Sequence, residues 1–177
     1  KLAGGQSYVE SAAEFMIFCA DLKRPGNYCA EYQKSFEGDY TEHFIIATVD
    51  VALMAQSMVA AAESVGLGIC YIGGIRNDPA QVSELLELPK GVYPVFGLCL
   101  GYPDQDPEVK PRLPLSVILK EEVYNEVGDR EAISEYDDHI REYYKTRTGG
   151  GHGISCTEQV SSLLSEKARP HMRGFLE

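Results

Sequence analysis

The sequence predicts a fold of packed helices and strands, because three short apolar runs each lie beside a helical pattern. The runs cover residues 15–20, 67–72 and 93–101, and their length and lack of charge are typical of buried strands. Between the first two runs, residues 44–65 form one long helical pattern. Taken alone, this alternation predicts an α/β layer arrangement around a central helix.

The central helix is apolar on almost every side. Residues 39–42 form a capping-box pattern at its start, and Gly66 can end it in a left-handed conformation. A helix of this kind must be covered all round, so we expect it in the core or shared between two subunits. A membrane span is the alternative, but Asp50 and Glu63 interrupt the apolar run and no Lys or Arg flanks it. We therefore expect no membrane insertion.

The segment between the first strand and the central helix is expected to be a surface excursion. Residues 22–38 show no clear period, and Pro-Gly-Asn at 25–27 is a turn signal. One helical turn is expected near residues 30–36.

Three further helices follow from capping and proline signals. Asp78 caps a helix that Pro89 closes, and Asp129 caps a helix that ends near residue 145. The last helix spans about residues 157–168, and residues 115–119 are expected to be extended. The inward stripe of the first of these helices consists of Val82, Leu85, Leu86 and Leu88.

Composition restricts the class of protein. A chain of 177 residues is long enough for one domain with a core, and a net charge of −11 argues against nucleic acid, whose phosphates would repel it. The five cysteines show no metal-ligand spacing, and three of them lie in the strand-like runs, so we expect buried thiols. An odd cysteine count without a signal peptide predicts a reducing cytoplasm.

No catalytic motif is present that supplies its own acid, base or nucleophile. The four histidines show no pair at metal spacing, so no metal site is expected. Gly73 and Gly74 follow a strand, where bare backbone can approach a ligand. Lys110 and Arg112 lie on a proline-braced loop and can bind an anion, although two solvated cations are the simpler interpretation. An enzyme of this sequence would depend on a cofactor.

Several motifs in order resemble one known family, the nitroreductase superfamily. They are AAESVGLG at 61–68, YIGGIRN at 71–77, the stretch LELPKGVYPVFGLCLGYP at 86–103, and KPRLP at 110–114. The chain is most similar to the NADPH-dependent branch, which contains oxygen-insensitive nitroreductases and NADPH–flavin oxidoreductases. The resemblance covers residues 4–145 and 165–176.

The resemblance implies an α+β fold, with a sheet sandwiched between helices and a helical C-terminal arm. It implies one domain over residues 1–177, a homodimer joined through the long central helix, and FMN at the dimer interface. The residues that match the family's cofactor contacts are Gln6, Tyr71, Ile72, Gly73, Gly74, Lys110 and Arg112. Arg147 and Arg169 match arginines that hold NADPH in relatives.

The chain departs from the family pattern at two places. Relatives normally begin with a longer segment whose Arg-Ser-x-Arg stretch binds the FMN phosphate, and this stretch is absent here. Relatives also carry a basic cluster where this chain has GGGHG at 149–153. The preference between NADPH and NADH therefore stays open.

The resemblance implies an FMN-dependent NAD(P)H oxidoreductase with a ping-pong hydride-transfer mechanism. Its acceptors would be small aromatic electron acceptors such as nitro compounds and quinones, or free flavins. The alternatives are a non-catalytic flavin-binding or structural protein, and a helical interaction module that needs a partner chain.

Overall fold

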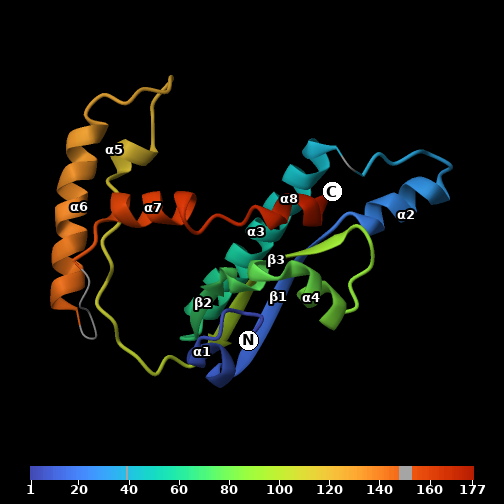
Figure 1. The fold of residues 1–177 in the computed structure, drawn as a ribbon, viewed down its shortest axis with the longest axis horizontal. Helices are drawn as coiled ribbons and strands as arrows, with labels where there is room; N and C mark the ends of the chain where they lie inside the picture. Colours follow the sequence, from blue (N-terminus) through green and yellow to red (C-terminus); the bar gives the residue numbers. More distant parts are fainter. Residues whose placement is uncertain (39, 148–152) are drawn as a thin grey trace. The chain divides into compact units, whose positions relative to one another are not determined.

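The computed structural model describes residues 1–38, 40–147 and 153–177, and it divides into two compact units (Figure 1). Unit 1 comprises Lys1–Asp104 and Arg169–Glu177, and unit 2 comprises Gln105–Ala168. Each unit is described by itself below.

Unit 1 is built on a three-stranded antiparallel sheet with the order β1-β3-β2. The strands are β1 (Glu14–Asp21), β2 (Gly68–Ile72) and β3 (Val92–Gly101), which confirms the three predicted strands. The outer strands both pair with β3 in antiparallel orientation. The fold is therefore α+β, and the α/β layer arrangement expected from the alternation of elements alone is wrong.

The core of unit 1 lies where α3 (Thr41–Ser64) runs along the sheet (Figure 1). Phe18 and Leu98 from the strands form one buried cluster with Ala55 and Val59 from α3. The helix ends as predicted, because Gly66 has a φ of +81°. The amide groups of residues 66 and 67 donate to the carbonyls of residues 63 and 62, the double bond pattern of a glycine-terminated helix.

The start of α3 differs from the prediction. Tyr40 is the N-cap residue and its side chain makes no capping hydrogen bond. Asp39, the first residue of the predicted capping box, lies outside the described residues.

The single chain does not cover α3 on every side. Its buried residues are Ala47, Ala55, Val59 and Ala62, whereas Leu53 and Met54 are 63% and 66% exposed. The expectation of complete burial is wrong for one chain, because the sheet reaches only one side of the helix. By length and composition α3 also passes for a membrane span, with a mean hydropathy of 1.8, which is weak evidence for one.

The excursion after β1 contains a helix that the sequence did not predict. Helix α2 spans Lys23–Glu31, so the turn signal at Pro25 was misleading and the expected turn near residues 30–36 is wrong. Proline is tolerated in a first helical turn, where its missing N–H needs no partner. Asp21 supports this start, because its Oδ1 accepts from the Arg24 amide at 3.0 Å.

The predicted cap at Asp78 is confirmed. Its side chain accepts from the Gln81 amide at 3.0 Å at the start of α4 (Pro79–Leu85). The expected inward stripe is only partly right, because Val82 is buried but Leu85 is 70% exposed. Three short helices complete unit 1: α1 (Ser7–Ser11), the 3-10 helix η1 (Gly73–Asn77) and α8 (His171–Leu176).

Unit 2 is helical in its described residues, with α5 (Leu115–Ile118), α6 (Asp129–Thr146) and α7 (Cys156–Ser165). Two details correct the sequence-based expectations. Residues 115–118 are helical rather than extended. Gly128, not Asp129, is the N-cap residue of α6, and the Asp129 carboxylate pairs with Lys120 Nζ at 2.5 Å.

The thiol prediction holds for one strand cysteine. Cys99 is buried, whereas Cys19 and Cys70 are half-buried. Burial raises the pKa of the Cys99 thiol, and the neighbouring Cys70 raises it further.

Replacement of Leu98 tests the position of the core. Leu98 is completely buried between α3 and the sheet, so Leu98→Ala should lower the free energy of unfolding by about 2–5 kcal/mol. Leu85→Ala is the matched control, and its effect should stay within about 0.5 kcal/mol because the side chain is exposed. Urea denaturation of both variants measures the difference, and equal losses would contradict this core assignment.

Candidate active site

The residues that end β2 carry four of the predicted cofactor positions. Tyr71 and Ile72 are the last residues of β2, and Gly73 and Gly74 begin η1. Tyr71 is 43% exposed, and its ring meets Phe96 edge-on with centroids 5.3 Å apart. Ile72 is only 2% exposed, so its side chain belongs to the core. A ligand at this edge can therefore meet the Tyr71 side chain but only the backbone of Ile72.

Gly74 packs closely on the N-terminal segment. A Cβ at Gly74 would lie 2.1 Å from the Ala3 carbonyl oxygen. The bare backbone thus accommodates the protein's own N-terminal segment. This packing brings the segment that carries Gln6 against the start of η1.

Gln6 has a polar atom without a partner. Its Oε1 is buried and accepts no hydrogen bond from the described part of the chain. A buried acceptor in this condition costs about 1–3 kcal/mol unless a further donor supplies the bond. The side chain is therefore a candidate for a ligand contact.

Two arginines of unit 1 lie close together. Arg169 Nε donates to Asn77 Oδ1 at 2.9 Å, and Arg76 Nη1 donates to the Val95 carbonyl at 2.6 Å. Burial lowers the pKa of the Arg76 guanidinium, and the positive charge of Arg169 lowers it further. Two like charges held near each other favour a bound anion.

In unit 2, tyrosines of α6 form hydrogen bonds with residues 105–114, which carry the predicted cations Lys110 and Arg112. We call residues 105–114 the strap. Tyr136 Oη donates to the Pro111 carbonyl at 3.2 Å, and Tyr143 Oη donates to the Glu108 carbonyl at 3.3 Å. Lys110 Nζ donates to Tyr144 Oη at 2.9 Å. The strap is thereby tied to α6 at three points.

The remaining two predicted residues of unit 2 differ in their surroundings. Arg112 is exposed. Arg147 follows α6 directly, and its guanidinium lies 5.6 Å from the ring centroids of both Tyr143 and Tyr144. The structure thus brings Lys110 and Arg147 to the same tyrosine, Tyr144.

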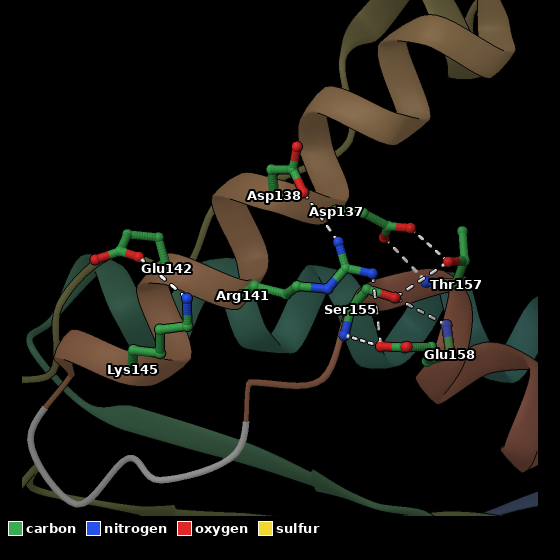
Figure 2. A network of polar contacts seen from close by, with 8 residues as sticks. All are labelled: Asp137, Asp138, Arg141, Glu142, Lys145, Ser155, Thr157 and Glu158. Carbon is green, nitrogen blue, oxygen red and sulfur yellow. Dashed lines mark hydrogen bonds and ion pairs between the residues drawn. The ribbon is translucent and has the colours of Figure 1, made fainter.

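A polar network joins α6 to the start of α7 (Figure 2). Asp137 is 7% exposed, and it accepts from the Thr157 amide at 3.1 Å and from the Thr157 hydroxyl. Ser155 caps α7 in a complete capping box with Glu158. Arg141 pairs with Asp138 at 2.9 Å and reaches Glu158 at 3.8 Å. This network fixes the start of α7 against α6, and residues 148–152 between the two helices lie outside the described residues.

Comparison with known proteins shows which protein family this chain matches. Residues 9–102 match the model of the nitroreductase family, and residues 110–177 match the C-terminal domain of the same family. The chain is 45% identical over 176 residues to an NADPH-flavin oxidoreductase of Vibrio harveyi, an alignment that covers 99% of this chain and 71% of the relative.

Two further similarities agree with this match. An oxygen-insensitive NADPH nitroreductase of Salmonella typhimurium is 41% identical over 175 residues, covering 99% of this chain and 71% of the relative. The solved structure of a nitroreductase from B. subtilis superposes with a TM-score of 0.92 at 40% identity, covering 99% of this chain and 72% of that one.

The chain belongs to the nitroreductase family. The resemblance inferred from the motifs is therefore confirmed, and with it the α+β fold class.

Each unit of this nitroreductase, taken by itself, has groups that suit a flavin. The isoalloxazine ring carries one ring N–H between two carbonyl groups, and the unpartnered Oε1 of Gln6 can accept a hydrogen bond from such a donor. The half-exposed Tyr71 offers an aromatic surface at the end of β2. Lys110 supplies a cation in unit 2.

Arg76 is a further candidate residue, which the sequence-based predictions did not include. Arg76 lies in the YIGGIRN motif, and a Cβ at Gly73 would lie 3.1 Å from Arg76 Nη2. The guanidinium therefore packs on a predicted cofactor residue. The signal was present in the sequence, because Arg76 follows Gly73 by three residues, one turn of a 3-10 helix.

The Asp137 network predicts a pH-dependent contribution to stability. Burial raises the pKa of the Asp137 carboxyl, but the hydrogen bonds from Thr157 outweigh it, and the pKa is lowered overall. A lowered folded-state pKa stabilises the fold above the ordinary aspartate value, and this contribution disappears as the pH falls through the folded-state pKa. Asp137→Asn should therefore cost about 1–3 kcal/mol at neutral pH and less in acid.

Asp138→Asn is the matched control, because its side chain is 76% exposed in its pair with Arg141. Its cost should stay below about 1 kcal/mol. Thermal unfolding of both variants across a pH series measures the two costs. An Asp137 effect that did not change with pH would refute this interpretation.

Proposed function

We propose that the protein is an FMN-dependent NAD(P)H oxidoreductase that reduces nitro compounds, quinones or free flavins. The observation that carries the proposal is the similarity of 99% of the chain to relatives named NADPH-flavin oxidoreductase and oxygen-insensitive NADPH nitroreductase. An FMN reductase of Bacillus subtilis that uses NADPH is also 40% identical over 180 residues. A non-catalytic role is not favoured, because these relatives are named for reductase activity.

In this proposal the residues of unit 1 bind the flavin ring. Gln6 Oε1 accepts a hydrogen bond from the ring, which would satisfy its buried oxygen. Tyr71 presents its exposed ring, and Ile72, Gly73 and Gly74 contribute backbone. When bound, FMN supplies the hydride chemistry, accepting from NAD(P)H and passing electrons to the acceptor in a ping-pong cycle.

Each unit supplies cations for the anionic parts of the cofactors. Lys110 and Arg112 contact the polar edge of the flavin ring or the phosphate of FMN. At the ring, their positive charge stabilises the negative charge that develops on reduction. Arg147 and Arg169 contact NAD(P)H, and Arg76 lies beside Arg169. Arginine is suited to this task because its planar fork matches phosphate oxygens.

We further propose a cytoplasmic homodimer in which the two units act as one nitroreductase-like domain. The support is the exposed apolar side of α3, where Ile45, Ile46 and Val49 are each about half exposed. Exposed apolar patches of this kind mark protein interfaces. A second copy would bury this surface without any change in the fold of the chain.

A turnover assay tests the proposed function. Protein loaded with FMN should oxidise NADPH faster in the presence of a quinone or a nitroaromatic compound than free FMN does at the same concentration. NADPH absorbance gives the rate. Protein that binds FMN but never exceeds the free-flavin rate would contradict the enzyme assignment.

Lys110→Ala tests the flavin contact in unit 2. The loss of a charge-assisted contact should weaken FMN binding by about 1–3 kcal/mol, or roughly 5- to 150-fold in Kd. Fluorescence titration of FMN measures this, with Lys90→Ala as a control that removes an exposed lysine of unit 1. Equal Kd values for the two variants would remove Lys110 from the site.

Leu53→Glu tests the homodimer. The side chain is 63% exposed on α3, so a carboxylate there should disfavour an apolar interface and shift the protein toward monomer. Val109→Glu, at a residue that is 93% exposed outside α3, should leave the assembly unchanged. Sedimentation velocity gives the mass, and a Leu53→Glu protein that sediments like the wild type would argue against an α3 interface.

A further inference from the structure

We propose that Tyr144 is a positioning residue that holds Lys110 and Arg147 at once, and so couples the flavin-binding cation to the NAD(P)H-binding cation. The inference rests on the proposed function, because it uses the roles given there to the two cations. All three residues belong to unit 2.

The first contact of Tyr144 is with Lys110. The lysine ammonium donates to the Tyr144 hydroxyl at 2.9 Å, and the strap around it is fixed by Tyr136 and Tyr143 through the Pro111 and Glu108 carbonyls. A free lysine side chain has about 2 kcal/mol of rotamer entropy to lose when it is ordered. Tyr144 orders it before a ligand arrives, so binding loses less entropy.

The second contact of Tyr144 is with Arg147. The guanidinium lies 5.6 Å from the Tyr144 ring centroid and equally far from that of Tyr143. The two rings meet edge to face, with centroids 5.3 Å apart and an angle of 67°. Cation–π contact at such distances attracts the guanidinium to the rings. Arg147 is thus held by aromatic faces at the point where α6 ends.

The kind of partner distinguishes these two cations from others in the same unit. Lys120 pairs with Asp129, Arg141 with Asp138 and Lys145 with Glu142. A carboxylate partner neutralises a cation, whereas a phenol leaves its charge in place.

Among the described residues, no hydrogen bond or ion pair occupies the remaining donors of the two held cations. Lys110 uses one of its three N–H groups on the Tyr144 hydroxyl, and a cation–π contact to Arg147 uses none of the five guanidinium donors. Tyr144 therefore fixes both side chains while leaving positive charge and hydrogen-bond donors for an anionic ligand. The chain has a net charge of −11, so an anion binds only where positive charge stays available. A carboxylate partner would neutralise that charge.

The surroundings of the phenol agree with this role. The hydrogen bond from Lys110 lowers the pKa of Tyr144 despite the opposing effect of burial, and the charge of Arg147 acts in the same direction. Tyr144 thus joins the strap to α6.

Two substitutions separate the two contacts. Tyr144→Phe removes the hydroxyl but keeps the ring, so it should raise the Kd for FMN about tenfold through Lys110 while the KM for NADPH stays near the wild-type value. Tyr144→Leu removes the ring as well, so it should raise both the Kd for FMN and the KM for NADPH. The Kd comes from fluorescence titration, which needs no turnover. Tyr124→Phe is the matched control, because it removes an exposed hydroxyl that donates to Glu126 and should bind FMN like the wild type.

The outcomes distinguish this inference from the proposed function. If the wild type binds FMN and turns over NADPH but Tyr144→Phe binds FMN equally well, Tyr144 has no positioning role and the proposed function stands. The positioning role is likewise overturned if Tyr124→Phe weakens FMN binding as much as Tyr144→Phe does. A wild type that binds no FMN overturns both. If Tyr144→Leu fails to fold, as judged by circular dichroism, the isosteric Tyr144→Phe still decides.

Discussion

The contact between α3 and the antiparallel sheet is the constraint on which unit 1 depends. Phe18, Leu98, Ala55 and Val59 close the core along one side of the helix. The chain then turns at Gly66 and returns as β2, which delivers Tyr71 and the residues of η1 to the candidate site. Because a single sheet covers only one side, the same helix that builds the core also presents an exposed apolar side. The core and the proposed dimer interface thus use two sides of one apolar helix.

The candidate site depends on groups that the chain itself leaves unsatisfied. Gln6 keeps a buried oxygen without a donor from the described residues, and Arg76 and Arg169 place like charges side by side. In unit 2, Lys110 and Arg147 rest on tyrosines instead of carboxylates. The buried Gln6 oxygen is costly without a donor, and the cations favour a bound anion. An anionic, hydrogen-bonding ligand suits both kinds of group. A flavin and a nicotinamide nucleotide have these properties.

The sequence predicted the elements whose signal is local and strong. The three strands and α3 are apolar runs bounded by charge or glycine, and Asp78 caps α4 as its pattern indicates. It failed where tertiary contacts outweigh local preference: Pro25 lies inside α2, Leu85 is exposed, and Asp129 pairs with Lys120 rather than capping α6. In the candidate site, the family resemblance predicts Gln6 and Lys110 as cofactor contacts. Tyr144 could not be found in this way, because its hydrogen-bond partner Lys110 lies 34 residues away in sequence. Arg76 did have a signal in the sequence, because it follows Gly73, on which it packs, by three residues.

The central claim is that this chain carries electrons between two substrates that bind in turn, and anaerobic half-reactions measure it most directly. FMN-loaded protein is mixed with NADPH alone, the nucleotide is removed, and a quinone is then added while the visible flavin absorption is followed. We expect the absorption to disappear in the first step and to return in the second, with no NADPH present. Absorption that remains unchanged until both substrates are present together would contradict the claim.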